Sequence, residues 1–464
     1  MPDATQPSTP AVPHAGDQAV PVSEVLASLS RALDLTEGQP LGHSVRSCVI
    51  GMRLGREAGL GEDDLAELYY ALLLKDAGCS SNAARLASVF GSDDHAVKPR
   101  LKTVDWDDRM ALAVETWRAS GMRQSLGSRL RYFLGVARQE HMARDVIATR
   151  CERGAEIARR LGFPKGTVEA IRSLDEHWNG NGHPEGRSGE AIPLLSRILN
   201  IAQTIEVFWA SEGPEATATM LRDRRGRWFD PTLTDRAVAM LPDPSLWVSV
   251  QSPDVDALVV AMEPVAEMRR VGARGLDDIA RAYADIIDAK SPFTFRHSSQ
   301  VAAYATAIGE QLRFDAATMT RTRRAALLHD IGKVGVSNRI LDKNGPLDLD
   351  ERAAIERHPL HTWEILRRIS AFADFARQAA THHEKLDGTG YPWNLGADEL
   401  DLPSRALVVA DIYEALTASR PYRDGMSVEK ALGILERDKG TRLDASCVDA
   451  LAAVVTRDAG EDSL

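Results

Sequence analysis

The sequence predicts an all-α protein in which one helical fold occurs twice. Apolar residues recur at spacings of three and four in stretches such as VSEVLASLSRAL and VEKALGILE, which is the period of a helix with one buried face. Alternating, strand-like patterns are scarce. Stretches of the first half also return in the second half at a constant spacing, as an internal repeat does. We therefore expect two tandem helical bundles.

Length and charge limit the classes of function. The 464 residues exceed what one hydrophobic core usually serves, and 44% of them are hydrophobic, which is enough for two domains. A formal net charge of -11 argues against a nucleic-acid polymer or an anionic membrane as partner, because both attract basic surfaces. No apolar run approaches the roughly 20 residues that a membrane span needs.

The cysteines indicate a reducing compartment. All four are far apart in the sequence and none belongs to a Cys-x-x-Cys pair; they are Cys48, Cys79, Cys151 and Cys447. Neither a disulfide framework nor a zinc knuckle is indicated by this spacing. We expect the protein to reside in the cytoplasm.

Two constant offsets relate the copies. HSVRSCVIGMRLGREAGL and LLLKDAG of the first half match HSSQVAAYATAIGEQLRF and LLHDIG at an offset of 254 residues. NGNGHP and SRILNIAQTIE match DGTGYP and SRALVVADIYE at an offset of 208. The first copy therefore holds an insertion of about 46 residues between Asp76 and Arg150, including RQSLGSRLRYFLGVARQEHMARD. This arginine-rich segment is either a solvated helical face or a surface for a partner or an oligomer.

The predicted domains follow the chain in order. A disordered tail rich in Pro, Thr and Ala is expected over 1–22. The first copy covers 23–250, with its insertion at about 77–149. The prolines of PDPSLWVSVQSPDVD mark a linker over 251–275. The second copy then covers 276–464.

The second copy collects side chains that suit transition metals. They are His297, His329, Asp330, His358, His382, His383 and Asp411, and all are expected on helices. Ser291-Pro292 are expected to cap the helix that carries the first, and a second helix should end near Asp330, before Gly332. Neutral imidazole and carboxylate ligands suit divalent iron, manganese, zinc or nickel. A single such histidine is more often structural, but the combined set is specific.

Seven ligands exceed the needs of one ion. Adjacent helical residues point about 100° apart, so neighbours can address two ions, and the two oxygens of Asp330 can bridge them. Two ions roughly 3.5 to 4 Å apart can hold a hydroxide nucleophile and stabilise charge on a phosphoryl group. His361, one turn after His358, is interpreted as a structural neighbour of the ligands.

The motifs of the second copy resemble the HD-GYP family of the HD phosphohydrolase superfamily. SPFTFRHSSQV, LLHDIGKVGV, RHPLHTWEIL, HHEKLDGTGYP and ADIYEALTASRPYR occur in the family's order over about 275–450. The resemblance implies an all-helical bundle with two or three metal ions, commonly iron or manganese. It further implies hydrolysis of cyclic di-GMP to pGpG or GMP, and some members accept cyclic GMP-AMP.

The resemblance also implies roles for single residues. The seven side chains above become the metal ligands, with Asp330 bridging and catalytic. Lys333 becomes a catalytic contact to the scissile phosphate, although alone it could be a solvated lysine. Tyr391, Arg420 and Arg423 correspond to nucleotide contacts, although a structural ion pair is an equal alternative for either arginine. Their loop is shaped by three further residues, Gly388, Gly390 and Pro392.

One position departs from the pattern of three-metal members. Those proteins carry an added glutamate four residues before the first histidine, and Phe293 stands there in this chain. We therefore expect two ions.

The first copy lacks most of the ligand set. His43 and Asp76 are retained, but the other five positions hold Lys75, Arg150, Leu174, Asp175 and Gln203. Lysine and arginine would place fixed positive charge where metal cations would sit, so this copy should not hydrolyse phosphodiesters. His177 and His183 are expected on a turn outside the ligand frame. The retained apolar frame suits a scaffold, a homodimer contact or a regulatory partner.

Three functions are compatible with these residues. The leading hypothesis is a metal-dependent phosphodiesterase that cleaves cyclic di-GMP. A second is an HD phosphohydrolase acting on another nucleotide, including cyclic GMP-AMP. The third is a non-catalytic receptor for a cyclic dinucleotide. The full ligand set with Lys333 favours catalysis, because a receptor needs no pair of metals.

Overall fold

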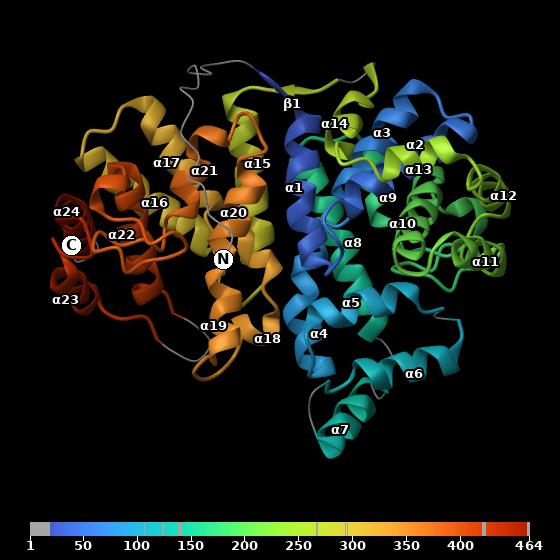
Figure 1. Cartoon of the computed structure of the whole chain (residues 1–464), viewed down its shortest axis with the longest axis horizontal. Coiled ribbons are helices and arrows are strands. Elements are labelled where there is room, and N and C mark those ends of the chain that lie inside the picture. Colours follow the sequence, from blue (N-terminus) through green and yellow to red (C-terminus); the bar gives the residue numbers. More distant parts are fainter. Residues whose placement is uncertain are drawn as a thin grey trace, which may run out of the picture.

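The computed structural model is almost entirely helical (Figure 1). It describes residues 19–461, apart from 106, 123–124, 138–141, 266–267, 293, 295 and 420–423. The strands in this part are β1 (Val20–Pro21) and β2 (Arg270–Val271), which pair antiparallel. The predicted all-α fold is confirmed. None of the described helices is both long and apolar enough to cross a membrane.

The first copy is a helical bundle with its own apolar core. Its helices are α1 (Val22–Thr36), α2 (His43–Glu57), α3 (Glu62–Leu74), α8 (Met142–Arg160), α9 (Lys165–Arg172), α10 (Leu194–Glu212), α11 (Pro214–Arg224), α12 (Pro231–Met240), α13 (Pro244–Val250) and α14 (Val255–Ala261). The core lies mainly between α2, α3 and α10, and Tyr69 and Tyr70 of α3 are fully buried in it.

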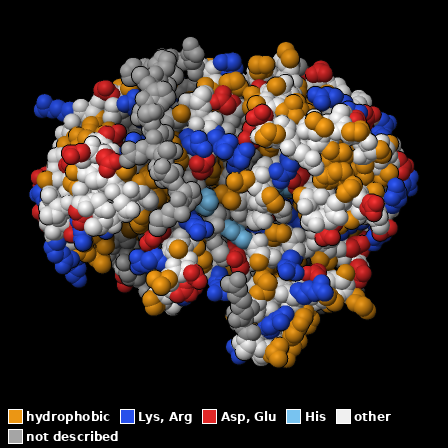
Figure 2. Space-filling model, viewed as in Figure 1, with side chains coloured by type: hydrophobic (Ala, Val, Ile, Leu, Met, Phe, Trp, Pro, Cys, Tyr) orange, Lys and Arg blue, Asp and Glu red, His pale blue; other side chains and the backbone are white. Residues whose placement is uncertain are grey.

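The insertion of the first copy forms a separate lobe. It consists of η1 (Cys79–Asn82), α4 (Ala83–Phe90), α5 (Asp94–Thr103), α6 (Arg109–Ala119) and α7 (Leu126–Ala137). Figure 1 shows α6 and α7 projecting below the rest of the molecule. Leu126, Leu130 and Leu134 lie one turn apart on α7 and are all exposed, and hydrophobic side chains gather at the tip of this lobe in Figure 2.

The second copy repeats the bundle. Its helices are α15 (Ala273–Asp288), α16 (His297–Gln311), α17 (Ala316–Leu328), η4 (Ile331–Gly335), α18 (Asn338–Leu341), α19 (Leu349–Glu356), α20 (His358–Leu366), α21 (Ala373–Ala380), η5 (Ala397–Glu399), α22 (Leu402–Thr417), α23 (Val428–Asp438) and α24 (Ala445–Glu461). Its apolar core contains side chains of α15, α16, α17, α21, α22 and α24.

The two offsets found in the sequence recur in the structure. α2 and α16 begin 254 residues apart and both have 15 residues, and α3 and α17 share the same offset with 13 residues each. α10 and α22 begin 208 residues apart. The two equivalent loops at the 208-residue offset each contain a cis proline, at His183-Pro184 and Tyr391-Pro392. Equivalent positions in the two copies can therefore be compared directly.

Helix α1 belongs to both cores. Val22, Leu26 and Ala27 are buried in the core of the first copy, whereas Val25, Leu29, Ala32 and Leu33 are buried in that of the second. In Figure 1 this helix stands between the two bundles. The two copies are thus packed together through α1, which buries apolar side chains on two of its faces, one in each core.

Some element limits differ from the sequence-based expectations. Residues 1–18 of the predicted tail lie outside the described residues, but Val20–Pro21 form β1 and Val22 begins α1. The predicted linker 251–275 contains α14 and β2. Ser291-Pro292 precede α16 without starting it, because the Ser291 hydroxyl donates to Asp342 instead and the helix begins six residues later.

Candidate metal centre

The structure brings all seven predicted ligands together in the second copy. His297 and His358 begin α16 and α20, and Asp411 lies within α22. The remaining four lie in turns and not on helices as expected: His329-Asp330 follow α17, and His382-His383 follow α21. A turn directs two adjacent side chains into one space, which a helix would have separated. All are buried except His383, whose side chain is 24% exposed.

Glycine fixes the turn that carries His329 and Asp330. A Cβ at Gly332 would lie 1.9 Å from the carbonyl oxygen of His358, so only glycine lets the turn pack against α20. Thr362 of α20 accepts a hydrogen bond from the Gly332 amide at 3.1 Å and donates one to the His329 carbonyl at 2.8 Å. These contacts set His329 and Asp330 beside His358.

Three imidazoles are oriented by hydrogen bonds to the backbone. The Nδ1 atoms of His329, His358 and His382 each lie 2.7 Å from the carbonyl oxygen three residues earlier. A carbonyl only accepts, so Nδ1 carries the proton and Nε2 presents a lone pair toward the cluster. Nε2 of His358 and Nε2 of His382 are 3.0 Å apart. Two facing lone pairs at this distance favour a cation between them, and this donor set therefore fits a metal.

The ligands divide into two groups of three. One consists of His297, His329 and Asp330, the other of His358, His382 and His383, and ligand atoms within each group lie within 4.8 Å of one another. A third group at the same spacing, His329, His382 and Asp411, overlaps both. Asp330 faces both groups. Its Oδ2 lies 3.3 Å from His297 Nε2, and its Oδ1 lies 3.3 Å from His358 Nε2. Because Oδ1 is buried with no hydrogen-bond partner, this carboxylate fits a bridge between two ions.

The carboxylates of the centre are ionised. Although burial opposes charge, His329 and Lys333 hold the pKa of Asp330 well below its usual range. Burial would also lower the pKa of His329, but Asp330 and Asp411 raise it to about 9. Burial lowers the pKa of His358 to about 4, which leaves it neutral. The cluster is therefore a buried anionic site in which His358 is neutral, whereas His329 must lose a proton when a divalent cation binds.

Lys333 and Tyr391 border the centre. The Lys333 ammonium lies 2.6 Å from Asp330 Oδ2, and its side chain is 21% exposed, so it can also reach a bound anion. The Tyr391 ring packs on the His383 ring with centroids 4.7 Å apart. Arg420, Arg423 and Phe293, which the sequence analysis singled out, lie outside the described residues.

Two glutamates of the centre were missed by sequence reasoning. Glu414 contacts His297 Nδ1, and Glu384 accepts hydrogen bonds from the Trp393 and Leu395 amides at 2.7 and 2.9 Å, which closes the Gly-Tyr-Pro turn. A signal for both existed. Each has a counterpart at the 208 offset in the first copy, Glu206 and Glu176, with corresponding contacts.

A buried lysine lies in the first copy where the second copy has the candidate ligand His329. His43 Nδ1 contacts Glu206, as His297 contacts Glu414. Lys75 stands at the position of His329, and its ammonium lies 2.9 Å from His43 Nε2 and contacts Asp76. The side chains of Lys75 and Asp76 are both fully buried. The expected filling by positive charge is thus seen directly.

A second acidic cluster of the first copy is also occupied by cations. Glu37, Asp76 and Cys79 have the spacing of a metal site. However, the Lys102 ammonium lies 2.7 Å from Glu37, and Lys98 lies 3.4 Å from it. A divalent cation would meet two ammonium groups there. His177 and His183 take no part in either cluster and lie on the turn, as expected.

Comparisons with known proteins agree with this geometry. A family model described as "HD domain" matches residues 135–233 and 281–447. The 3'3'-cGAMP-specific phosphodiesterase 3 of Vibrio cholerae is 43% identical over 432 residues, covering 93% of this chain and 94% of the relative. A cyclic di-GMP phosphodiesterase response regulator of Xanthomonas campestris is 32% identical over 200 residues, covering 42% and 52%. The crystal structure of a cyclic GMP-AMP-specific phosphodiesterase of Vibrio cholerae superimposes with a TM-score of 0.66 at 39% identity, covering 95% of this chain and 98% of that one.

Proposed function

The chain belongs to the HD-domain family of metal-dependent phosphohydrolases, and from this premise we propose that its second copy hydrolyses a cyclic dinucleotide. The observation that carries the proposal is the pair of three-ligand groups bridged by Asp330. Two such groups at one carboxylate suit the two-metal hydrolysis of phosphodiesters. The relatives above, named as cyclic dinucleotide phosphodiesterases, supply the substrate class.

The residues of the second copy have distinct tasks in this reaction. His297 and His329 would hold one ion, and His358, His382 and His383 the other, with Asp330 between them and Asp411 beside the first. When bound, two ions would supply positive charge for the phosphoryl oxygens and a water of lowered pKa. Lys333 is placed to donate to a phosphate oxygen, where its charge offsets the charge that develops during displacement. Tyr391 offers an aromatic edge at the rim beside His383.

Two ions, iron or manganese, are the metal content that we propose. The two groups of three ligands support the number, and the mixture of imidazole and carboxylate supports a borderline transition metal. Elemental analysis of anaerobically prepared protein tests it. About two equivalents per chain are expected, and ions in a 1–250 fragment would contradict the assignment to the second copy.

Within the substrate class we propose 3'3'-cyclic GMP-AMP. The sequence motifs alone favour cyclic di-GMP, with cyclic GMP-AMP as an alternative. The relative that matches over 94% of its length is named for cyclic GMP-AMP, whereas the cyclic di-GMP enzyme of Xanthomonas campestris matches over only 52%. Cyclic di-GMP is therefore the second candidate. Four free, buried cysteines support a reducing compartment such as the cytoplasm as the place of action.

One experiment tests the activity and the choice of substrate. Metal-loaded protein is incubated with 3'3'-cyclic GMP-AMP, cyclic di-GMP and a linear dinucleotide, and the products are separated by chromatography. We expect cleavage of both cyclic dinucleotides, faster for cyclic GMP-AMP. Asp330→Asn, which keeps the shape of the bridging side chain, serves as the inactive control. Cleavage of the linear compound alone would refute the proposed substrate class.

A further inference from the structure

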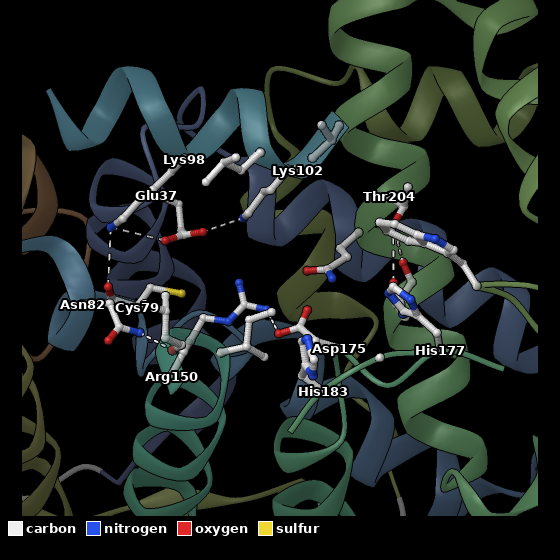
Figure 3. A pocket seen from close by; sticks show the side chains of 18 of the residues that line it. Glu37, Cys79, Asn82, Lys98, Lys102, Arg150, Asp175, His177, His183 and Thr204 are labelled. Atoms are coloured by element: carbon white, nitrogen blue, oxygen red, sulfur yellow. Dashed lines mark hydrogen bonds and ion pairs between the residues drawn. The ribbon is translucent and has the colours of Figure 1, made fainter. Parts of the chain in front are cut away.

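The first copy contains a cavity beside the positions that correspond to the candidate metal centre of the second copy. Its volume is about 130 Å³ (Figure 3). Arg150, Asp175 and Gln203 line it, and at the 208 offset they stand where the second copy has His358, His383 and Asp411. The insertion supplies part of the wall, through Lys98 and Lys102 of α5. The hollow therefore lies beside Lys75 and Asp76, which do not line it.

Polar atoms in this wall have no partner within the protein. They are Gln203 Oε1, His177 Nδ1 and Arg150 Nε, all buried without a hydrogen bond. Gln203 is only 9% exposed and His177 only 6%. Leaving such an atom unpaired costs about 1–3 kcal/mol, and buried polar atoms in native proteins almost always have partners. A ligand or ordered water inside the cavity can supply these partners.

Charge and aromatic surface lie at opposite ends. Figure 3 shows Lys98, Lys102 and Arg150 at one end, with His177 at the other. Glu37 pairs with both Lys98 and Lys102, and Asp175 pairs with Arg150, so two carboxylates face three cations and one positive charge is in excess. The His177 ring is stacked on Trp228, with centroids 4.0 Å apart and an angle of 22° between the ring planes. A fitting ligand is thus anionic at one end and flat at the other.

The two ends differ in depth. The side chains of Lys102 and Arg150 are 16% and 15% exposed, whereas Gln203 and His177 are more deeply buried. An engineered cavity of about 150 Å³ accommodates benzene, so a flat ring fits the deep end. The anionic part would then lie beside Lys102 and Arg150, whose Nζ and Nε atoms are buried, so these charges are already desolvated before an anion binds.

We propose that this cavity binds a nucleoside monophosphate without hydrolysing it. The base lies at the deep end beside the His177–Trp228 pair and donates an N–H to Gln203 Oε1. The phosphate accepts from Lys102 Nζ and from Arg150 Nε at the cationic end of the cavity. No hydrolysis follows, because Lys75 holds the position of a metal ligand and its ammonium pairs with Asp76.

Helix α5 connects this site to the second copy. Lys98 and Lys102 lie one turn apart, in its middle and at its C-terminal end, and Asp94 at its start accepts a hydrogen bond from the Asn338 amide at 2.9 Å. The Asp94 carboxylate also lies 3.7 Å from the Lys290 ammonium. Asn338 follows η4, the short helix that carries Lys333. Occupation of the cavity should therefore reach the segment 331–342, a consequence that rests on the proposed function of Lys333.

Calorimetry on the full-length, metal-loaded protein tests the site with GMP, AMP and inorganic phosphate as probes. Gln203→Leu keeps the side-chain volume and removes the unpaired oxygen, and Gln251→Leu on the exposed surface of the same copy is its matched control. GMP or AMP should bind, and Gln203→Leu should weaken one class of sites about tenfold, the loss expected for one hydrogen bond. His177→Phe keeps the stacking on Trp228 and should weaken the same class, which serves if Gln203→Leu does not fold.

Defined results would overturn the proposal. The first is that neither GMP nor AMP binds at concentrations up to about 1 mM. The second is that the wild type and both cavity variants bind GMP or AMP equally well. Phosphate binding as tight as GMP binding would show an anion site without a base. Hydrogen exchange provides a readout independent of turnover: GMP should slow exchange over 331–342 in wild type and Gln251→Leu but not in Gln203→Leu. Equal exchange in all three would refute the connection through α5.

Discussion

Replacing Lys75 by methionine tests whether a buried ammonium stands in for a metal in the first copy. The side chain keeps its length and loses its charge, which leaves Asp76 fully buried without its nearest cation. Removing one partner of a buried ion pair costs about 3–5 kcal/mol. Lys102, whose ammonium lies 3.8 Å from Asp76, compensates in part, so we expect the lower end of that range.

Urea denaturation followed by tryptophan fluorescence measures this loss. Six of the eight tryptophans lie before residue 250, so the signal reports mainly on the first copy. With a urea dependence of about 2 kcal/mol/M, a loss of about 3 kcal/mol lowers the midpoint by about 1.5 M. Lys165→Met, at an exposed position of α9, should change stability by less than about 0.5 kcal/mol.

The second substitution separates charge from packing. Adding Asp76→Asn removes the buried carboxylate that Lys75→Met leaves without its cation. The double variant Lys75→Met/Asp76→Asn should therefore recover about half of the lost stability, because no uncompensated buried charge remains. Metal content and turnover of the second copy should stay at the wild-type level in both variants. An unchanged midpoint for Lys75→Met would refute the view that its charge holds the first copy together.

Further outcomes are expected for other residues. Asp330→Ala should abolish hydrolysis and lower the metal content. Lys333→Ala should keep the metals and slow turnover by about 10² to 10³, as loss of a charge-stabilising donor does. If elemental analysis showed that Lys333→Ala had lost metal, its role as a phosphate contact would be contradicted. His43→Gln should leave the metal content unchanged, and a lower content would place it in the centre. Burial lowers the pKa of His177 to about 4, so the unfolded chain binds the proton first and stability falls as the pH drops below about 6.5. The loss between pH 7 and 5 is about 2 kcal/mol, and His177→Phe should remove that part of the pH dependence in urea titrations. A 275–464 fragment should aggregate, because it lacks the side chains of α1 that cover its core; a monomeric fragment in light scattering would show that this cover is dispensable.

The sequence determined the helical fold, the repeat and the candidate ligands. Apolar period is a local property, so it identified helices such as α16 and α17 and their counterparts α2 and α3 before any contact was known. The constant offsets between the copies can likewise be read from the sequence alone, and they matched Lys75 with His329 correctly. The seven candidate ligands followed from residue type and order. Their placement on helices was wrong for the two adjacent pairs, and the turn at Gly332 depends on contact with the distant backbone of His358.

Tertiary structure alone decided how these residues are used. Nothing in the sequence shows that α1 is buried on both faces, because a periodic pattern records a buried face and not the partner that covers it. Only the fold places the two oxygens of Asp330 toward different groups of ligands. The pairing of Lys75 with His43, 32 residues away, and the hollow beside Gln203 likewise depend on helices that meet in space. Residue type sets which chemistry a side chain can perform, whereas distance and burial, which arise only on packing, decide whether it does so.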